Sequence, residues 1–344
     1  MKILFVAPVQ PFRVSKPRDY FEHNFPFYGI NLLATILRKE GHTVDVLDSL
    51  SAYLMALPSP LALIDLSCVV EQQLRVNSYD IVCISLLAWG LLRHCLTIGR
   101  CAKQHHCTVI LGGVHALDEG IHIIRNNVDC VDIVVVGEGE QTLPELIRSY
   151  AQGIPARDTI RGIVYYDNHA LETTPPRAIL SDLDVLPLID YKQYCIEKWC
   201  PRTVVINTMR GCPWKCAFCS STHMWAQMRR RSVEHIMKEI HFLFKTVKPH
   251  KLFFDDDNFL PDASGIFLLK EIIRFRKASS VDFELLIRTR FDHVTKDFLS
   301  LYKEAGGKTV FIGLESSERL RNSLLNKQID MGRVRENLAH VRSL

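Results

Sequence analysis

The sequence predicts an α/β fold in which a doubly wound parallel sheet is followed by part of a (β/α) barrel. Short apolar runs alternate with amphipathic segments along most of the 344 residues, and this alternation pauses at a proline-containing stretch before it resumes. Continuous apolar strands are typical of parallel sheets that helices cover on both faces. We therefore expect one domain over residues 1–155, a linker over 156–200 and a barrel domain over 201–344.

The first domain is expected to hold a five-stranded, flavodoxin-like parallel sheet. Its strands are predicted at 2–6, 43–47, 80–85, 108–111 and 132–136, and its helices at 28–40, 61–76, 91–103, 120–126 and 142–151. In such sheets ligands bind outside the carboxyl ends of the strands. The residues at or just after those ends include Ser85, Gly112, Gly113, His115, Gly137 and Glu138. Paired glycines allow a bulky ligand to come close, and no G-x-G-x-x-G opens the first helix, which argues against NAD.

The linker is expected to contain a hairpin and then extended chain. Residues 162–166 and the segment from Ala170 onward flank a polar turn, although the strongest Asn-Gly signal is missing. Prolines in 175–176 and at the end of 183–187 disfavour helix. This stretch is predicted to strap the two domains together.

The second domain is expected to contain four β/α units. Its strands are predicted at 203–208, 251–254, 283–287 and 309–313, and its helices at 233–247, 263–278, 296–305 and 331–344. Ser232 is the predicted N-cap of the first of these helices. In (β/α) barrels the chemistry gathers at the carboxyl ends of the strands.

Three cysteines after the first of these strands form the most specific pattern in the chain. Cys212, Cys216 and Cys219 have the spacing Cys-x3-Cys-x2-Cys, which suits an iron–sulfur cluster and leaves one iron without a protein ligand. Closed zinc sites need four N or S ligands. A structural zinc site with His223 as the fourth ligand therefore remains an alternative.

This cysteine pattern, with Phe218 between the last two cysteines, resembles the signature of the radical S-adenosylmethionine enzymes. The resemblance implies that the three cysteines bind a 4Fe-4S cluster, that S-adenosylmethionine chelates the fourth iron, and that the reduced cluster cleaves it to a 5'-deoxyadenosyl radical. It also implies that Phe218 lines the adenine. Core packing is the alternative role for this ring.

The later strand ends carry further residues that match the same family. The resemblance places Asp256, Arg290 and Glu315 around S-adenosylmethionine, with the carboxylates near its amine and ribose and the arginine near its carboxylate. Opposite charges favour one another in a water-poor cleft. The aspartates from Asp255 to Asp257 could instead form a charge cluster at a helix N-terminus. A calcium loop lacks the required glycine and glutamate.

The first domain resembles the cobalamin-binding domain that precedes one large radical S-adenosylmethionine class. The matching segments are 28–34 with 41–45, 111–116 and 136–143. No Asp-x-His-x-x-Gly occurs, so cobalamin is expected to bind without a histidine ligand. His115 could ligate cobalt, but hydrogen bonding to the backbone or lining a pocket is the expected role.

Composition adds weaker constraints. Eleven cysteines, an odd number set mostly singly in apolar segments, favour a reduced cytoplasmic protein over a disulfide scaffold. Basic residues exceed acidic ones by four, which gives no reason to expect nucleic-acid or membrane binding, and no apolar run is long enough to span a membrane.

The resemblance implies an enzyme that acts on a small molecule, with methyl transfer as the leading reaction, and an electron donor such as flavodoxin or ferredoxin. Ring formation or rearrangement is an alternative, and so is a non-catalytic cobalamin or iron–sulfur protein. Family barrels have six units, and this chain ends at the fourth, so we expect a fragment or a truncated product.

Overall fold

The computed structural model describes residues 1–9, 12–13, 26–48, 63–153, 156–167, 170–195, 202–225, 227–313, 315 and 323–342. The chain forms two compact units. Unit 1 comprises residues 1–180 and 186–200, and unit 2 comprises residues 181–185 and 201–344. His223 falls in helix α8 (Ser221–Met224), but its side chain lies outside the described part, so its proposed role in zinc binding is not addressed.

Unit 1 is built on a sheet with the strand order β3-β1-β5-β6-β7-β8-β9. Its parallel strands are β1 (Lys2–Val6), β3 (Thr43–Leu47), β5 (Ile81–Ser85), β6 (Thr108–Gly112) and β7 (Ile133–Val135). Most of their side chains are buried, as expected for strands covered on both faces. The predicted α/β class with a mostly parallel sheet is confirmed.

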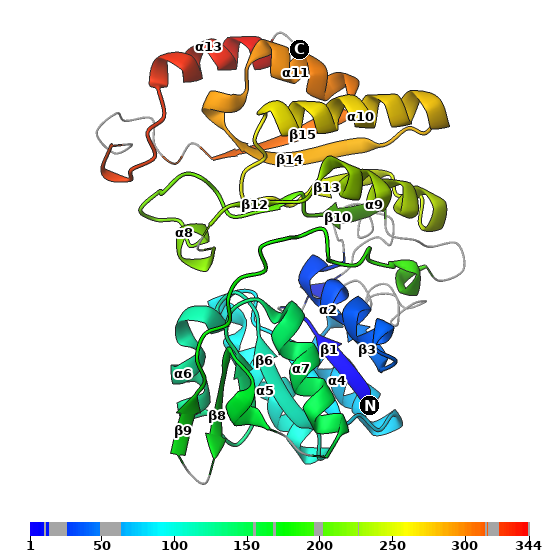
Figure 1. Ribbon diagram of the computed structural model, residues 1–344, viewed down its shortest axis with the longest axis vertical. Helices are drawn as coiled ribbons and strands as arrows, with labels where there is room; N and C mark the ends of the chain where they lie inside the picture. Colours follow the sequence, from blue (N-terminus) through cyan, green and yellow to red (C-terminus); the bar gives the residue numbers. More distant parts are fainter. Residues whose placement is uncertain are drawn as a thin grey trace. The chain divides into compact units, whose positions relative to one another are not determined.

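Helices cover both faces of this sheet. They are α2 (Tyr28–Lys39), α4 (Leu66–Val76), α5 (Leu92–Gln104), α6 (Ala116–Asn126) and α7 (Gly139–Ala151). Helices α2 and α7 pack side by side, and Ile30, Leu37 and Leu146 from them share one core cluster with the strands (Figure 1). Strands β3 and β5 lie on opposite sides of β1 in the sheet. Right-handed crossovers therefore place α4 and α5 on the face of the sheet opposite α2.

The predicted hairpin belongs to the sheet of unit 1 rather than to a linker. Strand β8 (Ile163–Asp167) pairs antiparallel with β7, and β9 (Ala170–Thr173) pairs with β8. The reason is the apolar start of β8, where Ile163 and Val164 are buried against the rest of the sheet. The outer edge of β7 therefore gains a hydrogen-bonding partner along its whole length.

Some element boundaries also differ from the prediction. Helix α4 begins at Leu66 rather than at 61, because Asp65 caps it by accepting a hydrogen bond from the Ser67 amide at 2.9 Å. The short strand β4 (Leu63–Ile64) precedes it and pairs with β2 (Phe12–Arg13). Single 3-10 turns complete unit 1: η1 (Trp89–Leu91), η2 (Arg157–Thr159) and η3 (Lys192–Tyr194).

Unit 2 contains a four-stranded parallel sheet whose order follows the sequence. Its strands are β10 (Thr203–Ile206), β13 (Lys251–Phe254), β14 (Glu284–Arg290) and β15 (Gly307–Gly313). The helices that follow them are α9 (Val233–Thr246), α10 (Ala263–Ser279), α11 (Lys296–Glu304) and α13 (Met331–Arg342), and the turn η4 (Phe291–His293) follows β14. Figure 1 shows α10 and α11 along the same side of β14 and β15.

Side-chain caps fix the starts of three of these helices. Ser232, Asp262 and Thr295 each accept a hydrogen bond from an amide in the first turn of α9, α10 and α11, respectively. The predicted cap at Ser232 is therefore present. Strand β14 runs three residues further than predicted and ends at Arg290 itself.

Two findings concern the composition-based expectations. No helix in the described part of the chain is long and apolar enough to cross a membrane. Nine described cysteines are free thiols, whereas Cys195 is disulfide-bonded, which departs from the expectation of a fully reduced chain.

Candidate functional site

The three motif cysteines lie on one loop, residues 211–228, which we call the cysteine loop. Its base is a small antiparallel ladder between β11 (Met209–Arg210) and β12 (Arg229–Arg230). Gly211 opens the loop with a φ of +82°, and a Cβ there would come 3.1 Å from both Gln227 and Trp225. A glycine is therefore required where the two ends of the loop approach each other.

The thiols of Cys212, Cys216 and Cys219 are all partly exposed. The amide of Cys219 donates to the carbonyl of Cys216 at 3.1 Å, so one tight turn carries these two cysteines. No three His, Cys, Asp or Glu side chains among the described residues gather closely enough to hold a single metal ion. Thiolates around one zinc lie at about 2.3 Å from the metal, whereas a four-iron cube is larger and holds its thiolates further apart.

Phe218 projects from the same turn, and its side chain is half exposed. This exposure contradicts the alternative in which the ring packs in a core. The Nζ atom of Lys327 lies 5.7 Å from the centroid of the ring. The face of the cysteine loop beside Phe218 therefore carries an accessible aromatic ring with a cation next to it.

Asp256, which the resemblance places near S-adenosylmethionine, has its carboxylate bound within the protein in this structure. Its carboxylate is fully buried and accepts hydrogen bonds from the amides of Thr208 and Met209, at 2.7 and 3.0 Å, and from the hydroxyl of Thr208. Burial raises the pKa of Asp256 to about 6, although these hydrogen bonds act in the opposite direction. Asp256 holds the chain that leads into the cysteine loop.

The neighbouring aspartates are anchors as well. Asp257 accepts a hydrogen bond from the Ser221 hydroxyl at 2.7 Å, and Asp255 is paired with Arg288. Helix α10 begins only at Ala263 with its own cap, so the three aspartates are not a charge cluster at its N-terminus. The residues that follow β13 thus hold the cysteine loop in place through hydrogen bonds and are tied to β14 by an ion pair.

Arg290, which the resemblance places near the carboxylate of S-adenosylmethionine, also has its guanidinium bound within the protein. Its guanidinium forms a bidentate pair with Asp292, at 3.0 and 3.1 Å, and donates to the Lys327 carbonyl at 2.7 Å. It also lies over the indole of Trp214, 3.9 Å from the ring centroid. Because Trp214 belongs to the cysteine loop, Arg290 fixes that loop against the end of β14.

Glu315 lies near the cysteine loop but pairs with a residue that the sequence did not indicate. Its carboxylate forms an ion pair with the buried Lys327, whose Nζ also donates to the Gly313 carbonyl at 2.7 Å. Burial lowers the pKa of Lys327, while the nearby cysteines Cys216 and Cys219 act to raise it. A buried cation therefore stands next to two of the three thiols.

The segment 325–327 docks directly on the cysteine loop. The Ala217 amide donates to the Leu325 carbonyl at 2.9 Å, and the Asn326 side chain donates to the Lys215 carbonyl at 2.7 Å. No periodic pattern or motif marked this segment, so sequence reasoning missed it. What distinguishes Lys327 is its burial, and the sequence does not reveal burial.

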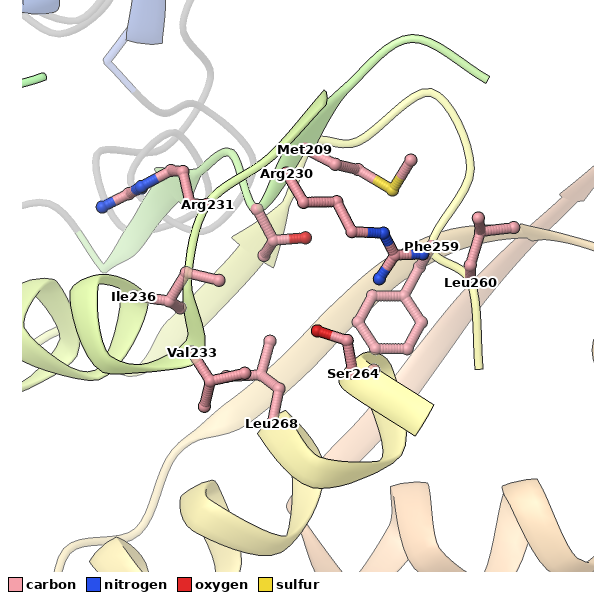
Figure 2. A pocket seen from close by; sticks show the side chains of 11 residues that line it. Met209, Arg230, Arg231, Val233, Ile236, Phe259, Leu260, Ser264 and Leu268 are labelled. Atoms are coloured by element: carbon pink, nitrogen blue, oxygen red, sulfur yellow. The ribbon is translucent and has the colours of Figure 1, made fainter. Parts of the chain in front are cut away.

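Beneath the cysteine loop the packing is nearly complete. A cavity of about 10 Å³ is bounded by residues at the starts of α9 and α10, and Arg230, Phe259 and Ser264 turn toward its middle (Figure 2). It is too small for a cofactor. A second hollow of about 400 Å³ lies between α10 and α11 and includes Asp292 and His293.

The residues predicted at the strand ends of unit 1 come together at one edge. Ser85 ends β5 and is in register with Gly112 at the end of β6, and Gly137 follows the neighbouring strand β7. Gly113 has a φ of +102°, and a Cβ there would lie 2.7 Å from the Leu86 carbonyl oxygen. The glycine is therefore needed first for packing against the end of β5.

The same edge presents apolar surface to solvent. Trp89 and Val114 are 50% and 40% exposed, respectively. His115 lies at the start of α6, and its side chain does not cap the helix. Glu138 is less available than predicted, because its carboxylate accepts a hydrogen bond from the Leu180 amide at 2.8 Å.

Both units match known protein families. The chain matches the description "B12 binding domain" over residues 19–147 and "Radical SAM superfamily" over residues 206–344. These two domains, in this order, confirm the resemblance carried by the motifs. The chain therefore combines a B12 binding domain with a radical S-adenosylmethionine domain.

Curated relatives include methyltransferases and a cyclase. An uncharacterised methyltransferase of Pyrococcus horikoshii is 26% identical, over 92% of this chain and 66% of its own. The hopanoid C-3 methylase of Methylococcus capsulatus is 24% identical, over 92% of this chain and 58% of its own. The anaerobic magnesium-protoporphyrin IX monomethyl ester cyclase of Cereibacter sphaeroides is 25% identical, over 66% of this chain and 38% of its own. The chain thus spans 38–66% of the length of these relatives.

Two solved structures share the fold. The radical S-adenosylmethionine methyltransferase TsrM from Kitasatospora setae, with tryptophan and a S-adenosylmethionine analogue bound, superimposes with a TM-score of 0.76 at 17% identity, over 99% of this chain and 65% of that one. The cobalamin-dependent radical enzyme OxsB, with aqua-cobalamin and S-adenosylmethionine bound, gives 0.73 at 18% identity, over 99% and 47%. At these identities the likeness shows the fold.

Proposed function

We propose that this protein is a radical S-adenosylmethionine enzyme that binds a 4Fe-4S cluster, S-adenosylmethionine and cobalamin, and that it transfers a methyl group to an unactivated carbon or phosphorus centre of a small molecule. The observation that carries the proposal is the cysteine loop of unit 2. Its three partly exposed thiols lie at the carboxyl end of a parallel sheet, held by Asp256, Arg290 and the 325–327 segment.

The residues present fit such a cluster. Three thiols are the donor type that iron–sulfur clusters take, and they leave one iron for another ligand. A buried side-chain donor, Nδ2 of Asn258, has no hydrogen-bond partner among the described residues, and it directly follows Asp256 and Asp257, which support the loop. The cluster, when bound, supplies the electron that cleaves S-adenosylmethionine.

For S-adenosylmethionine itself, we propose that Phe218 contacts the adenine and that Glu315 and Lys327 form a polar edge of the site. Phe218 is exposed on the loop, and Lys327 lies beside both it and Glu315. Lys327 is the cation that the structure offers here, since the guanidinium of Arg290 is already bound to Asp292. Asp256 and Arg290 act as supports rather than as ligand contacts.

For cobalamin, we propose the edge of unit 1 where β5, β6 and β7 end. Ser85, Gly112 and Gly137 lie at the strand ends there, and the exposed Trp89 adds apolar surface beside these small residues. The contacts described for His115 and Glu138 do not support a role for either residue in binding cobalamin. We further propose a flavodoxin or ferredoxin as electron donor and a cytoplasmic location, because reducing a cluster and keeping its thiolates reduced both need a reducing compartment.

Methyl transfer is favoured over cyclisation because methyltransferases recur among the relatives, which also include a cyclase. The proposal is tested by reconstituting the protein anaerobically with iron, sulfide and hydroxocobalamin, and adding reductant and S-adenosylmethionine. Release of 5'-deoxyadenosine together with methionine is the expected result. A reconstituted protein that holds both cofactors but leaves S-adenosylmethionine intact would instead support a non-catalytic binding protein.

A further inference from the structure

The two faces of strand β14 have different surroundings. Leu285 and Ile287 are fully buried on the face that helices α10 and α11 cover (Figure 1). Arg288 stands on the opposite face, because side chains alternate along a strand, and its side chain is 47% exposed. Arg290 follows on that same face and lies over Trp214 of the cysteine loop. The face away from the helices therefore runs from an exposed arginine to the cysteine loop.

Two phenylalanine rings lie beside the Arg288 guanidinium on this face. Phe253 of β13 and Phe311 of β15 come from the strands on either side of β14, and their ring centroids are 5.8 Å apart. The guanidinium carbon of Arg288 is 4.7 Å from the centroid of Phe253, and Arg288 is in register with Phe311. Phe253 is buried, whereas Phe311 is 48% exposed. Arg288 thus stacks on one ring, and the other offers apolar surface next to it.

Most N–H donors of Arg288 are unused within the described part of the chain. Its one hydrogen bond there runs from Nη1 to the carboxylate of Asp255. By contrast, three hydrogen bonds within the protein occupy the guanidinium of Arg290. Arginine carries five N–H donors in a rigid planar fork that matches carboxylate and phosphate groups. Asp255 and Phe253 therefore orient the fork of Arg288 and leave donors for a further anion.

We propose that this face binds the substrate, that the substrate carries an anionic group on an apolar body, and that Arg288 binds the anion while Phe311 contacts the apolar part. The anion is a carboxylate or a phosphonate, since both accept two parallel N–H bonds from a guanidinium. This assignment rests on the proposed function, whose substrate class it names. Arg288 is about 6–7 Å from Arg290 along the strand, so a substrate anchored there extends toward the cysteine loop. Arg288 then determines specificity and takes no part in bond making.

The test is the binding of methylphosphonate and phenylphosphonate to the full chain, measured by the broadening of their proton NMR signals. Both probes carry the anion, and only the second adds an aromatic body. Arg288→Gln can still donate to Asp255 but has no charge, and we expect both probes to bind about tenfold more weakly. Phe311→Ala should weaken phenylphosphonate and leave methylphosphonate unchanged. Phenylacetate, tested in parallel, shows whether a carboxylate or a phosphonate binds more tightly.

Arg274→Gln is the matched control. Arg274 is also exposed and also paired with one carboxylate, that of Glu271, but it lies on helix α10. Its variant should bind the probes as the wild type does. Equal binding in Arg288→Gln and Arg274→Gln, or a wild type that binds no probe, would overturn the inference.

A further measurement separates the substrate from the cofactor. If Arg288→Gln loses affinity for S-adenosylmethionine in reconstituted protein and keeps its affinity for the probes, Arg288 contacts the cofactor and the inference is wrong. Probe binding needs no cluster, so a negative result with the probes leaves the proposed function standing. A wild-type protein that takes up no cluster would overturn the proposed function, whatever the probes show.

Discussion

The guanidinium of Arg290 lies over the indole of Trp214, with 3.9 Å between the guanidinium carbon and the ring centroid. One residue ends the third strand of the unit 2 sheet, and the other belongs to the cysteine loop. Asp292 holds the opposite edge of the same guanidinium with two hydrogen bonds. Arg290 therefore fixes the cysteine loop to the end of β14, where the resemblance places S-adenosylmethionine.

Replacing Arg290 by Lys should loosen the cysteine loop. Lysine has a single ammonium group, so it cannot form a bidentate pair with Asp292 and at the same time stack a planar group on Trp214. We expect the free energy of unfolding to fall by about 1–3 kcal/mol and the cluster to lose iron faster to a chelator. Arg276→Lys is the control, since Arg276 also packs on an aromatic ring, Phe283, and pairs with Asp282, but near the start of β14 instead of its end. Equal rates of iron loss in the two variants would contradict the role of Arg290.

Asp256→Ala should be strongly destabilising because it leaves the buried amides of Thr208 and Met209 without an acceptor. We expect a loss of about 2–4 kcal/mol in chemical denaturation. Asp256→Asn retains an acceptor oxygen and should lose much less. If Asn and Ala cost the same, the carboxylate is not acting as the acceptor for these amides.

The same carboxyl group predicts a pH dependence. Its pKa is about 6 in the folded protein against 3.8 for an ordinary aspartate, so between these values the folded state holds a proton that the unfolded state has released. Its stabilising contribution is complete below the lower value and is lost as the pH rises through about 6. The change is about 3 kcal/mol by linkage. Denaturation of Asp256→Asn across this range should show a correspondingly flatter profile than the wild type.

Lys327→Met should weaken the binding of S-adenosylmethionine to reconstituted protein. The substitution removes the partner of Glu315 and the donor to the Gly313 carbonyl, while keeping the length of the side chain. We expect a loss of affinity of about tenfold, equivalent to about 1.4 kcal/mol, measured by calorimetry. Lys303→Met, in helix α11, provides a comparison. Wild-type affinity in Lys327→Met would remove this residue from the site.

The two glycines at the end of β6 should respond differently to alanine. Gly113→Ala forces a side chain into left-handed backbone and against Leu86, and we expect a loss of at least about 1–2 kcal/mol in stability. Gly112→Ala meets only an ordinary contact at 3.8 Å from Val135 and should fold normally. If the corrin lies on this edge, Gly112→Trp should fold and yet bind hydroxocobalamin poorly. Unimpaired binding would place the corrin elsewhere.

The sequence predicted most of what depends on local pattern. Alternating apolar runs located the parallel strands of both units, and Ser232 was recognised as a cap because its hydroxyl satisfies an amide nearby in sequence. The cysteine spacing likewise identified the loop. Such features are encoded within a few residues.

Contacts between distant segments could not be predicted in the same way. Motif resemblance placed Asp256 and Arg290 at the correct strand ends but gave no sign that their polar atoms are used internally. Lys327 is more than a hundred residues from Cys216 in sequence, and nothing near it forms a motif. Its burial depends on how the 325–327 segment docks on the loop, which follows from tertiary packing.

The most direct test of the central claim is the iron content of anaerobically reconstituted protein. We predict a brown protein with about four irons per chain in the wild type. The triple variant Cys212→Ala, Cys216→Ala and Cys219→Ala should hold none, and Cys68→Ala, at an exposed cysteine of unit 1, should hold as much as the wild type. A full cluster in the triple variant, or a colourless wild type with one zinc per chain, would contradict the account.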